Sequence, residues 1–196
     1  MANHVSTFIS FERISDAGRE KLNEILSRVR PSENAGRQWF GDMWVDGKDG
    51  SPSYDDTDTF DWMCENIGPK WCYIEEVDDD SIRVISAWSW PEKGVEWLID
   101  QIKLVDPKLI VSVQFEDEMP NFFGAYVYDA DGIVDGFEED WDELKERVEL
   151  SHPELADLEE ESDEWWDVMN ENMYEILNEA QYEIISETVQ NLLSEE

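Results

Sequence analysis

The sequence predicts a mixed α+β fold, and three features of the chain support this class. Segments with apolar residues at every second position alternate with segments whose apolar residues recur at helical spacing. Proline and glycine fall between these segments, where turns are expected. The chain has 196 residues, 41% of them hydrophobic, including 10 Trp, 8 Phe and 6 Tyr. It can therefore bury a core, unlike a disordered acidic chain, which is poor in aromatic residues.

The elements expected in the first half begin with a strand. Residues 4–13 alternate between apolar and polar side chains, which is typical of a half-buried strand. Ser15 can cap a helix that runs to about Arg30 and ends before Pro31. The further elements are a long loop over residues 31–58, a helix over 60–66, and strands over 70–77 and 82–90.

A second helix and three more strands are expected to follow. Pro91 suits the first position of a helix that continues to about Val105. The remaining elements are strands over residues 109–115, 122–128 and 133–137, and helices over 141–150 and 163–193. The last helix has an expected apolar stripe of Trp166, Met169, Met173, Ile176, Leu177, Ala180, Ile184 and Leu192.

The order of these elements predicts how the chain is organised. Strand, helix, strand, strand, helix, strand is the order of the split βαβ, ferredoxin-like arrangement, an antiparallel sheet with two packed helices. We therefore expect a ferredoxin-like α+β domain over residues 1–137. Residues 138–196 are expected to form an acidic helical segment that packs on this domain or extends from it.

The charge of the chain is large and uneven. It has 50 Asp and Glu against 14 Lys and Arg, a net charge of −36. Residues 1–50 have a net charge of only −1, whereas residues 151–196 contain 15 acidic residues and no Lys or Arg. A surface this negative repels phosphate, which argues against direct binding to nucleic acid or to an anionic membrane. A basic partner is the expected alternative.

No motif in the sequence indicates catalysis, a metal site or a cofactor. His4 and His152 stand apart from any nucleophile motif, and residues 129–135 lack the ligand spacing of a calcium loop and predict a turn. Cys64 and Cys72 are expected to be two buried thiols. There is no secretory signal and no apolar run of the ~20 residues that cross a bilayer, so a cytoplasmic protein is expected. We expect neither an enzyme nor a cofactor.

Residues 61–124 carry a resemblance to a known family. The matching residues are Trp62, Asn66-Ile67-Gly68-Pro69-Lys70-Trp71, Ser86-Ala87-Trp88-Ser89 with Pro91, and Phe122-Phe123-Gly124. In these residues the chain resembles the ferredoxin-like domain family of uncharacterised phage and plasmid proteins. That family has a pattern close to Asn-Trp-Gly-Thr-Lys-Trp, from which Ile67 and Pro69 depart. The resemblance implies the fold and an origin in a mobile element, and it implies no catalytic residues.

The most informative pattern is a row of acidic residues on the last helix. We call these seven residues the acid row, and they are Asp163, Asp167, Glu171, Glu175, Glu179, Glu183 and Glu187. Like charges four residues apart in a helix cost about 0.2–0.5 kcal/mol per pair, so the row is unfavourable for stability by itself. Four residues rise about 6 Å along a helix, close to the ~7 Å between phosphates of one nucleic-acid strand. A solvated amphipathic helix could also produce such a row, because its outer face is charged.

Further acids and aromatic residues are candidates for the same surface. The additional candidate partner-binding residues are Glu138, Glu139, Asp140, Asp142 and Glu143, and Asp55, Asp56 and Asp58 add charge elsewhere. Trp39, Trp44 and Trp165 are candidate exposed anchors beside the acids.

These patterns predict a phage-type DNA mimic. Such a protein would bind the basic groove of a host DNA-binding or defence protein, for example a restriction complex, and inhibit it without catalysis. An acidic adaptor or regulator that binds a basic protein surface unrelated to DNA is the alternative. The sequence does not decide whether the last helix packs on the sheet or pairs with a second copy as a homodimer.

Overall fold

The computed structural model describes residues 3–30 and 38–194 of the chain. In this part of the molecule one seven-stranded sheet has the order β2-β3-β4-β1-β5-β6-β7, and every neighbouring pair is antiparallel. The strands are β1 His4–Arg13, β2 Gln38–Trp39, β3 Cys72–Val77, β4 Ser81–Ala87, β5 Ile110–Asp117, β6 Phe122–Asp129 and β7 Gly132–Asp140.

Six α-helices and two short 3-10 helices accompany the sheet in the described residues. The α-helices are α1 Asp16–Leu26, α2 Tyr54–Thr57, α3 Phe60–Asn66, α4 Glu92–Lys103, α5 Trp141–Ser151 and α6 Asp163–Ser194. The 3-10 helices are η1 Phe40–Trp44 and η2 Pro153–Asp157. The α+β class is therefore confirmed, although the chain has more strands and more helices than a four-stranded sheet with two helices.

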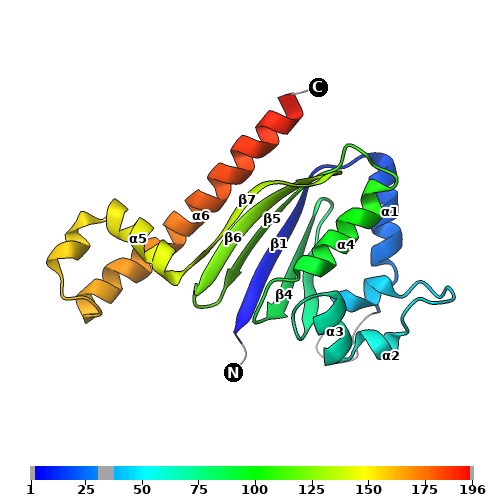
Figure 1. Cartoon of the computed structure of the whole chain (residues 1–196), viewed down its shortest axis with the longest axis horizontal. Coiled ribbons are helices and arrows are strands. Elements are labelled where there is room, and N and C mark those ends of the chain that lie inside the picture. Colours follow the sequence, from blue (N-terminus) through cyan, green and yellow to red (C-terminus); the bar gives the residue numbers. More distant parts are fainter. Residues whose placement is uncertain (1–2, 31–37, 195–196) are drawn as a thin grey trace.

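Helices α1 and α4 cover one face of the sheet (Figure 1). Ser15 caps α1 by accepting a hydrogen bond from the Gly18 N–H at 3.2 Å, as predicted, but the helix ends at Leu26 rather than Arg30. Leu22 of α1 and Leu98 of α4 pack against inward-facing strand residues such as Val113. This cluster is the main hydrophobic core.

The predicted long loop over residues 31–58 is wrong for most of its described part. Residues 31–37 lie outside the described residues, but β2, η1 and α2 all fall within residues 38–58. Phe40 and Met43 of η1 are fully buried in the main core. The carboxylate of Asp42, only 1% exposed, accepts hydrogen bonds from the Arg30 N–H at 3.1 Å and the Thr57 hydroxyl at 3.3 Å. Buried hydrogen bonds of this kind fix a segment whose composition resembles a loop.

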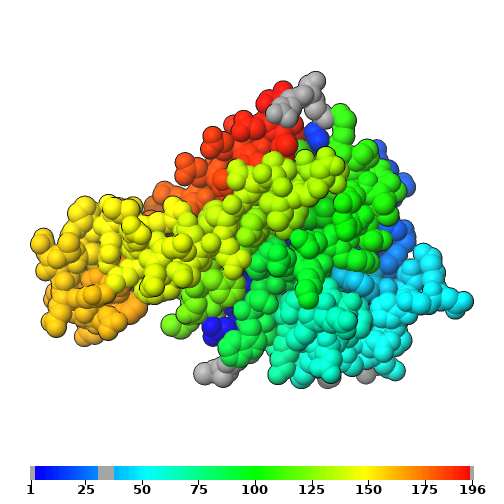
Figure 2. Space-filling view, viewed as in Figure 1, coloured from blue at the N-terminus to red at the C-terminus, as the bar shows by residue number. Residues whose placement is uncertain are grey.

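Helix α6 lies on the other face of the sheet and extends beyond it (Figure 1). Its second half packs on the sheet, where Ile185 and Val189 cluster with Ala125 and Val127 of β6 and with Ile110 of β5. Its first half leaves the sheet and packs on α5 and η2, where Trp165 and Met169 form a separate apolar cluster. Figure 2 shows this second region, coloured yellow to orange, standing out from the body of the molecule.

Three further expectations are corrected by the structure. Strand β7 is a full nine-residue strand that pairs along β6 and continues to Asp140, past residue 137. Cys72 is buried as expected, whereas Cys64 is exposed. On α6, Trp165 is 3% exposed and Trp166 is 36% exposed, so the buried tryptophan is Trp165 and not the predicted Trp166.

Among the described helices, none combines the length and the apolar character that crossing a bilayer requires.

Candidate functional site

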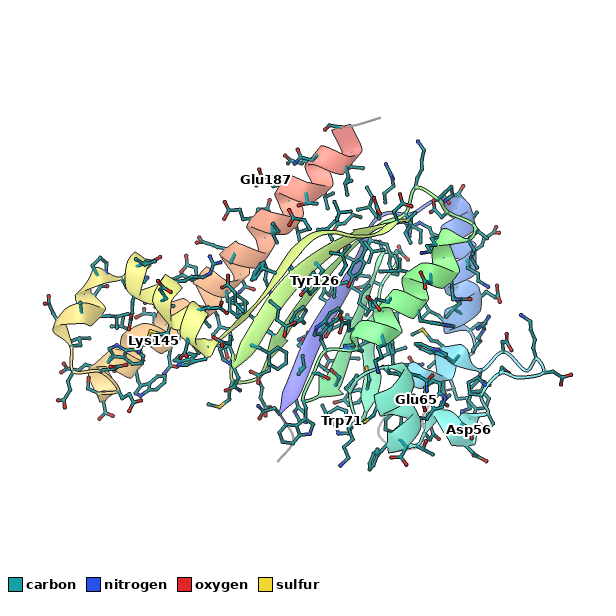
Figure 3. All side chains as sticks on the ribbon, in the orientation of Figure 1. Asp56, Glu65, Trp71, Tyr126, Lys145 and Glu187 are labelled. Atoms are coloured by element: carbon teal, nitrogen blue, oxygen red, sulfur yellow. The ribbon has the colours of Figure 1, made fainter. Side chains whose placement is uncertain are left out.

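All seven residues of the acid row are exposed along α6. A second row at the same spacing is buried, and it consists of Trp165, Met169, Met173, Leu177, Gln181, Ile185 and Val189. Each acid is two residues away from a buried residue, which corresponds to about 200° around the helix. The acid row therefore lies opposite the buried row along the whole helix. Figure 3 shows Glu187 on the side of α6 that faces away from the sheet.

The shared spacing of four explains how one helix contacts two different regions. Four residues turn about 40° more than a full turn, so both rows wind slowly around α6 in the right-handed sense. The buried row faces α5 and η2 at Met169 and faces the sheet at Val189. The acid row winds in step with it and stays in solvent.

The start of α6 is fixed by a side-chain cap. The Ser162 hydroxyl accepts a hydrogen bond from the Trp165 N–H at 3.2 Å. Asp163 and Glu164 lie in the first turn, where the helix dipole favours negative charge. The first member of the acid row is therefore in a favourable position, whereas the later members repel one another.

Little positive charge lies near the row. The ion pairs formed within residues 3–30 and 38–194 do not include any of its seven carboxylates. Arg147 of α5 is influenced by the charge of one residue of the row. Its pKa is raised first by its hydrogen bond to Glu139, and the charge of Glu183 raises it further.

Three of the other predicted acids have structural roles at the start of α5. Asp140 caps the helix by accepting hydrogen bonds from Asp142 N–H at 2.9 Å and Glu143 N–H at 3.3 Å. Glu143 completes the capping box by accepting a hydrogen bond from the Asp140 N–H at 2.8 Å. The carboxylate of Glu139 accepts two hydrogen bonds from Arg147, one of them from Nε at 2.6 Å. Asp142 is exposed in the first turn of the helix.

Glu138 does not join the acid row, because it lies on the face of the sheet that α4 covers. Burial raises its pKa, the charge of Glu92 raises it further, and a hydrogen bond with Trp90 opposes this rise. The acids near α2 are also separate, since Figure 3 shows Asp56 at the opposite end of the molecule from α6. Asp58 pairs with Arg30 at 3.3 Å.

The predicted aromatic anchors are mostly not available to a partner. Trp165 is buried, which contradicts the prediction. Trp44 is half-buried and stacks on Trp97 of α4 with ring centroids 3.8 Å apart. Trp39 is half-buried in β2.

A pocket beside the acid row contains the aromatic residues that the sequence analysis missed. We call it the tryptophan pocket, and its volume is about 500 Å³. Its principal lining residues are Glu118, Met119 and Asn121 of the β5–β6 connection, Trp141 of α5, and Trp166 and Tyr174 of α6. The only available signal was that Trp166 and Tyr174 lie eight residues apart on one face of the predicted helix.

The remaining candidates for chemistry are isolated in the structure. His4 pairs with Glu118 at 3.3 Å, and His152 pairs with Glu154 at 3.2 Å. Residues 129–132 form the turn between β6 and β7, in which Asp129 accepts a hydrogen bond from the Asp131 N–H at 2.7 Å. Within residues 3–30 and 38–194, no group of His, Cys, Asp and Glu is placed to hold a metal ion.

Comparisons of the chain with family models, with curated proteins and with solved structures found no match.

Proposed function

We propose that this protein is a DNA mimic that binds the basic groove of a DNA-binding or host defence protein and inhibits it without catalysis. The observation that carries the proposal is the exposure of all seven acid-row carboxylates opposite the buried row of α6. The helix lacks Lys and Arg throughout, so nothing on it neutralises the row. The carboxylates of the row repel one another, which lowers the free energy of unfolding. A charge pattern that lowers stability favours a role in binding.

The spacing of the row supports a likeness to a phosphate backbone. With a rise of about 6 Å, a surplus turn of about 40° and a side-chain radius of about 6 Å, neighbouring carboxylates lie about 7 Å apart. Neighbouring phosphates of one DNA strand are separated by a similar ~7 Å. Both lines wind in the right-handed sense. About four consecutive acids face one direction at a time, which is enough to occupy several Arg and Lys side chains.

The fold favours an origin like that implied by the family resemblance. The segment β1-α1-β3-β4-α4-β5 has the order β3-β4-β1-β5 in the sheet. The segment has the β-α-β-β-α-β element order of a ferredoxin-like arrangement, and we propose that it derives from such a domain and forms the inner part of the larger sheet. In this view the additions to that domain are β2, β6, β7 and the C-terminal helices. A mobile-element origin also implies that the protein acts in the cytoplasm of a host cell.

An acidic adaptor that binds a basic surface unrelated to DNA is the second candidate. The tryptophan pocket favours it, because apolar anchors and not phosphate-like spacing would then decide the partner. The two candidates differ in one respect. Binding by an adaptor should survive loss of charge along α6 and fail when the aromatic residues are changed.

Affinity capture with matched charge variants tests the proposal. The row variant carries Glu171→Gln, Glu175→Gln and Glu179→Gln. The control carries Asp78→Asn, Asp79→Asn and Asp80→Asn, which remove the same charge from the exposed turn between β3 and β4. From a bacterial lysate, the unmodified protein and the control should enrich DNA-binding proteins, and added duplex DNA should release them.

The row variant should capture those proteins at least about tenfold less well, because each lost close charge pair at an interface costs about 1 kcal/mol or more. Equal capture by the row variant and the control, or capture that duplex DNA does not affect, would overturn the proposal.

A further inference from the structure

The walls of the tryptophan pocket are held in place by a chain of hydrogen bonds. Asp117, which is buried, accepts hydrogen bonds from the main-chain N–H of Asn121 at 2.9 Å and from its side-chain amide at 2.7 Å. The Asn121 carbonyl accepts a hydrogen bond from the Trp141 N–H at 3.1 Å. Trp141 in turn stacks on Trp166, with ring centroids 5.7 Å apart and an angle of 25° between the rings. The pocket is therefore formed before any partner binds, which lowers the entropy cost of binding.

The lining of the pocket is mostly apolar, and its large apolar side chains are exposed to a partner. Trp166 is 36% exposed, Tyr174 is 40% exposed and Met119 is 68% exposed. Large apolar side chains that remain this exposed beside one another mark an interaction site more often than scattered single residues do.

The electrostatic field at the pocket is negative. Glu118 lies in the lining, and none of the described lining residues is Lys or Arg. Burial raises the pKa of the Tyr174 hydroxyl, and the charges of Glu116 and Asp117 raise it further. The same charges attract a cation to the pocket. Asp167 and Glu171 of the acid row directly follow Trp166 and Asn170 along α6, so the row borders the pocket.

The neighbouring tryptophan already holds a cation in a comparable setting. Lys145 of α5 lies with its Nζ 5.5 Å from the centre of the Trp165 ring. The same ammonium pairs with Glu149 at 3.7 Å and with Glu160. In the pair formed by α5 and α6, an indole face with carboxylates beside it therefore already binds a lysine ammonium group. Trp166 supplies a second indole ring, which lines the pocket. This ring is perpendicular to the Trp165 ring, with the two ring centroids 4.9 Å apart.

We infer that the tryptophan pocket binds an arginine side chain of the basic protein partner. A guanidinium group is planar, stacks on indole rings and is more weakly hydrated than an ammonium group, so it suits an apolar aromatic pocket better than lysine. Glu118 lines the pocket and pairs with His4 through Oε2 at 3.3 Å, and its other carboxylate oxygen can accept from the guanidinium N–H groups. The inference rests on the proposed function, because it names the side chain by which the partner of the acid row is anchored.

The experiment uses N-acetyl-arginine methylamide as the probe and the whole protein as the receptor. Indole N–H signals are followed by NMR at ~0.15 M salt, where long-range attraction to the net charge is screened. The signals of Trp141 and Trp166 are assigned with Trp141→Phe and Trp166→Phe. N-acetyl-citrulline methylamide is the matched control ligand, since it has nearly the same shape and no charge.

The inference predicts saturable shifts of the Trp141 and Trp166 signals with the arginine probe. The Kd for the citrulline probe should be about tenfold higher or more, which corresponds to the loss of a cation–π contact and an ion pair. Met119→Ala in the exposed connection should also weaken binding of the arginine probe, and it leaves the core intact. Equal shifts with both probes, or arginine shifts that are largest at Trp71 or Trp88, would overturn the inference.

Failure of this inference can be separated from failure of the proposed function. If the arginine probe does not bind while duplex DNA still releases the captured proteins, the pocket inference is wrong and the DNA-mimic proposal stands. If the probe binds but the captured proteins are unaffected by duplex DNA, the pocket stands and the proposed function fails.

Discussion

The side-chain amide of Gln181 in α6 donates a hydrogen bond to the main-chain carbonyl of Gly124 in β6 at 2.9 Å. The same Nε2 also lies 3.1 Å from the carbonyl oxygen of Phe115 in β5. Gly124 itself cannot be replaced without strain, because a Cβ atom there would lie 2.3 Å from the Phe137 carbonyl oxygen and 2.6 Å from the Phe115 ring. This buried polar contact locks the middle of the acidic helix onto the sheet and fixes the direction in which the acid row points.

Gln181→Ala is therefore expected to destabilise the protein. The change removes the side-chain amide donor, so the carbonyl groups of Gly124 and Phe115 lose this hydrogen bond. The loss should lower the free energy of unfolding by about 1–3 kcal/mol. Gln190→Ala, the same change at an exposed position of α6, is the control. Urea unfolding followed by circular dichroism measures both. The account of the contact is wrong if the two variants are equally stable.

The two adjacent tryptophans of α6 should respond differently to substitution. Trp165→Ala empties a buried site in the cluster with α5 and should cost about 3–5 kcal/mol. Trp166→Ala removes a partly exposed ring and should cost less than about 1.5 kcal/mol. The comparison is made by thermal and urea unfolding. A larger loss for Trp166→Ala would mean that the buried row begins at the other tryptophan.

Glu116 should make the stability depend on pH. Burial raises its pKa above the usual 4.5, Asp117 raises it further, and Arg83 partly opposes this. A raised carboxyl pKa means that the folded protein binds the proton more tightly than the unfolded chain. The free energy of unfolding therefore falls as pH rises from about 4.5 through the raised pKa, and the loss is complete above it.

Glu116→Gln should accordingly raise the free energy of unfolding at pH 7 and flatten its pH dependence between pH 7 and about 4.5. Urea unfolding at a series of pH values measures this. Glu187→Gln, which removes an exposed carboxylate, is the matched control. If the two variants have the same pH slope, Glu116 does not contribute the predicted penalty.

The negative charges of the acid row should not be needed for folding. Glu171→Lys together with Glu179→Lys converts four like-charge pairs at spacing four into attractive pairs, which should stabilise the protein by about 1–3 kcal/mol at low salt. The gain should shrink as salt is added, because exposed charges are screened. Urea unfolding at low and high salt checks both statements. A loss of stability would show that the row takes part in the fold itself.

Much of the fold could be predicted from the sequence because the signals were local. The alternation in residues 4–13 and the bounds of α3 at Phe60–Asn66 agree with the structure. The burial of η1 could not be predicted, because Asp42 is held by Arg30 and Thr57, which are distant in the sequence. The extent of β7 was missed for a similar reason, since its acidic end gains regularity only from pairing with β6.

In the candidate site too, features with local causes could be predicted from the sequence, whereas features that depend on contacts between distant residues could not. The exposure of the acid row follows from its spacing of four against a buried row of equal spacing. The role of Glu139 at the end of β7 depends on Arg147, which lies 8 residues further along in α5 and could not be paired from the sequence. The capping box of Asp140 and Glu143 was readable as a pattern, since an acceptor at the cap followed three residues later by Glu is its usual form. Met169, Met173 and Leu177 of the predicted stripe are buried, but the wrong tryptophan was chosen for its start, because Trp165 and Trp166 are chemically identical neighbours.

Mutually exclusive binding tests the central claim most directly. The anisotropy of a labelled duplex bound to a purified captured DNA-binding protein is measured while this protein is added. The account predicts that the anisotropy falls to that of free duplex, and that the variant with Glu171→Gln, Glu175→Gln and Glu179→Gln requires at least about tenfold more protein. A stable ternary complex of partner, duplex and this protein would contradict the account.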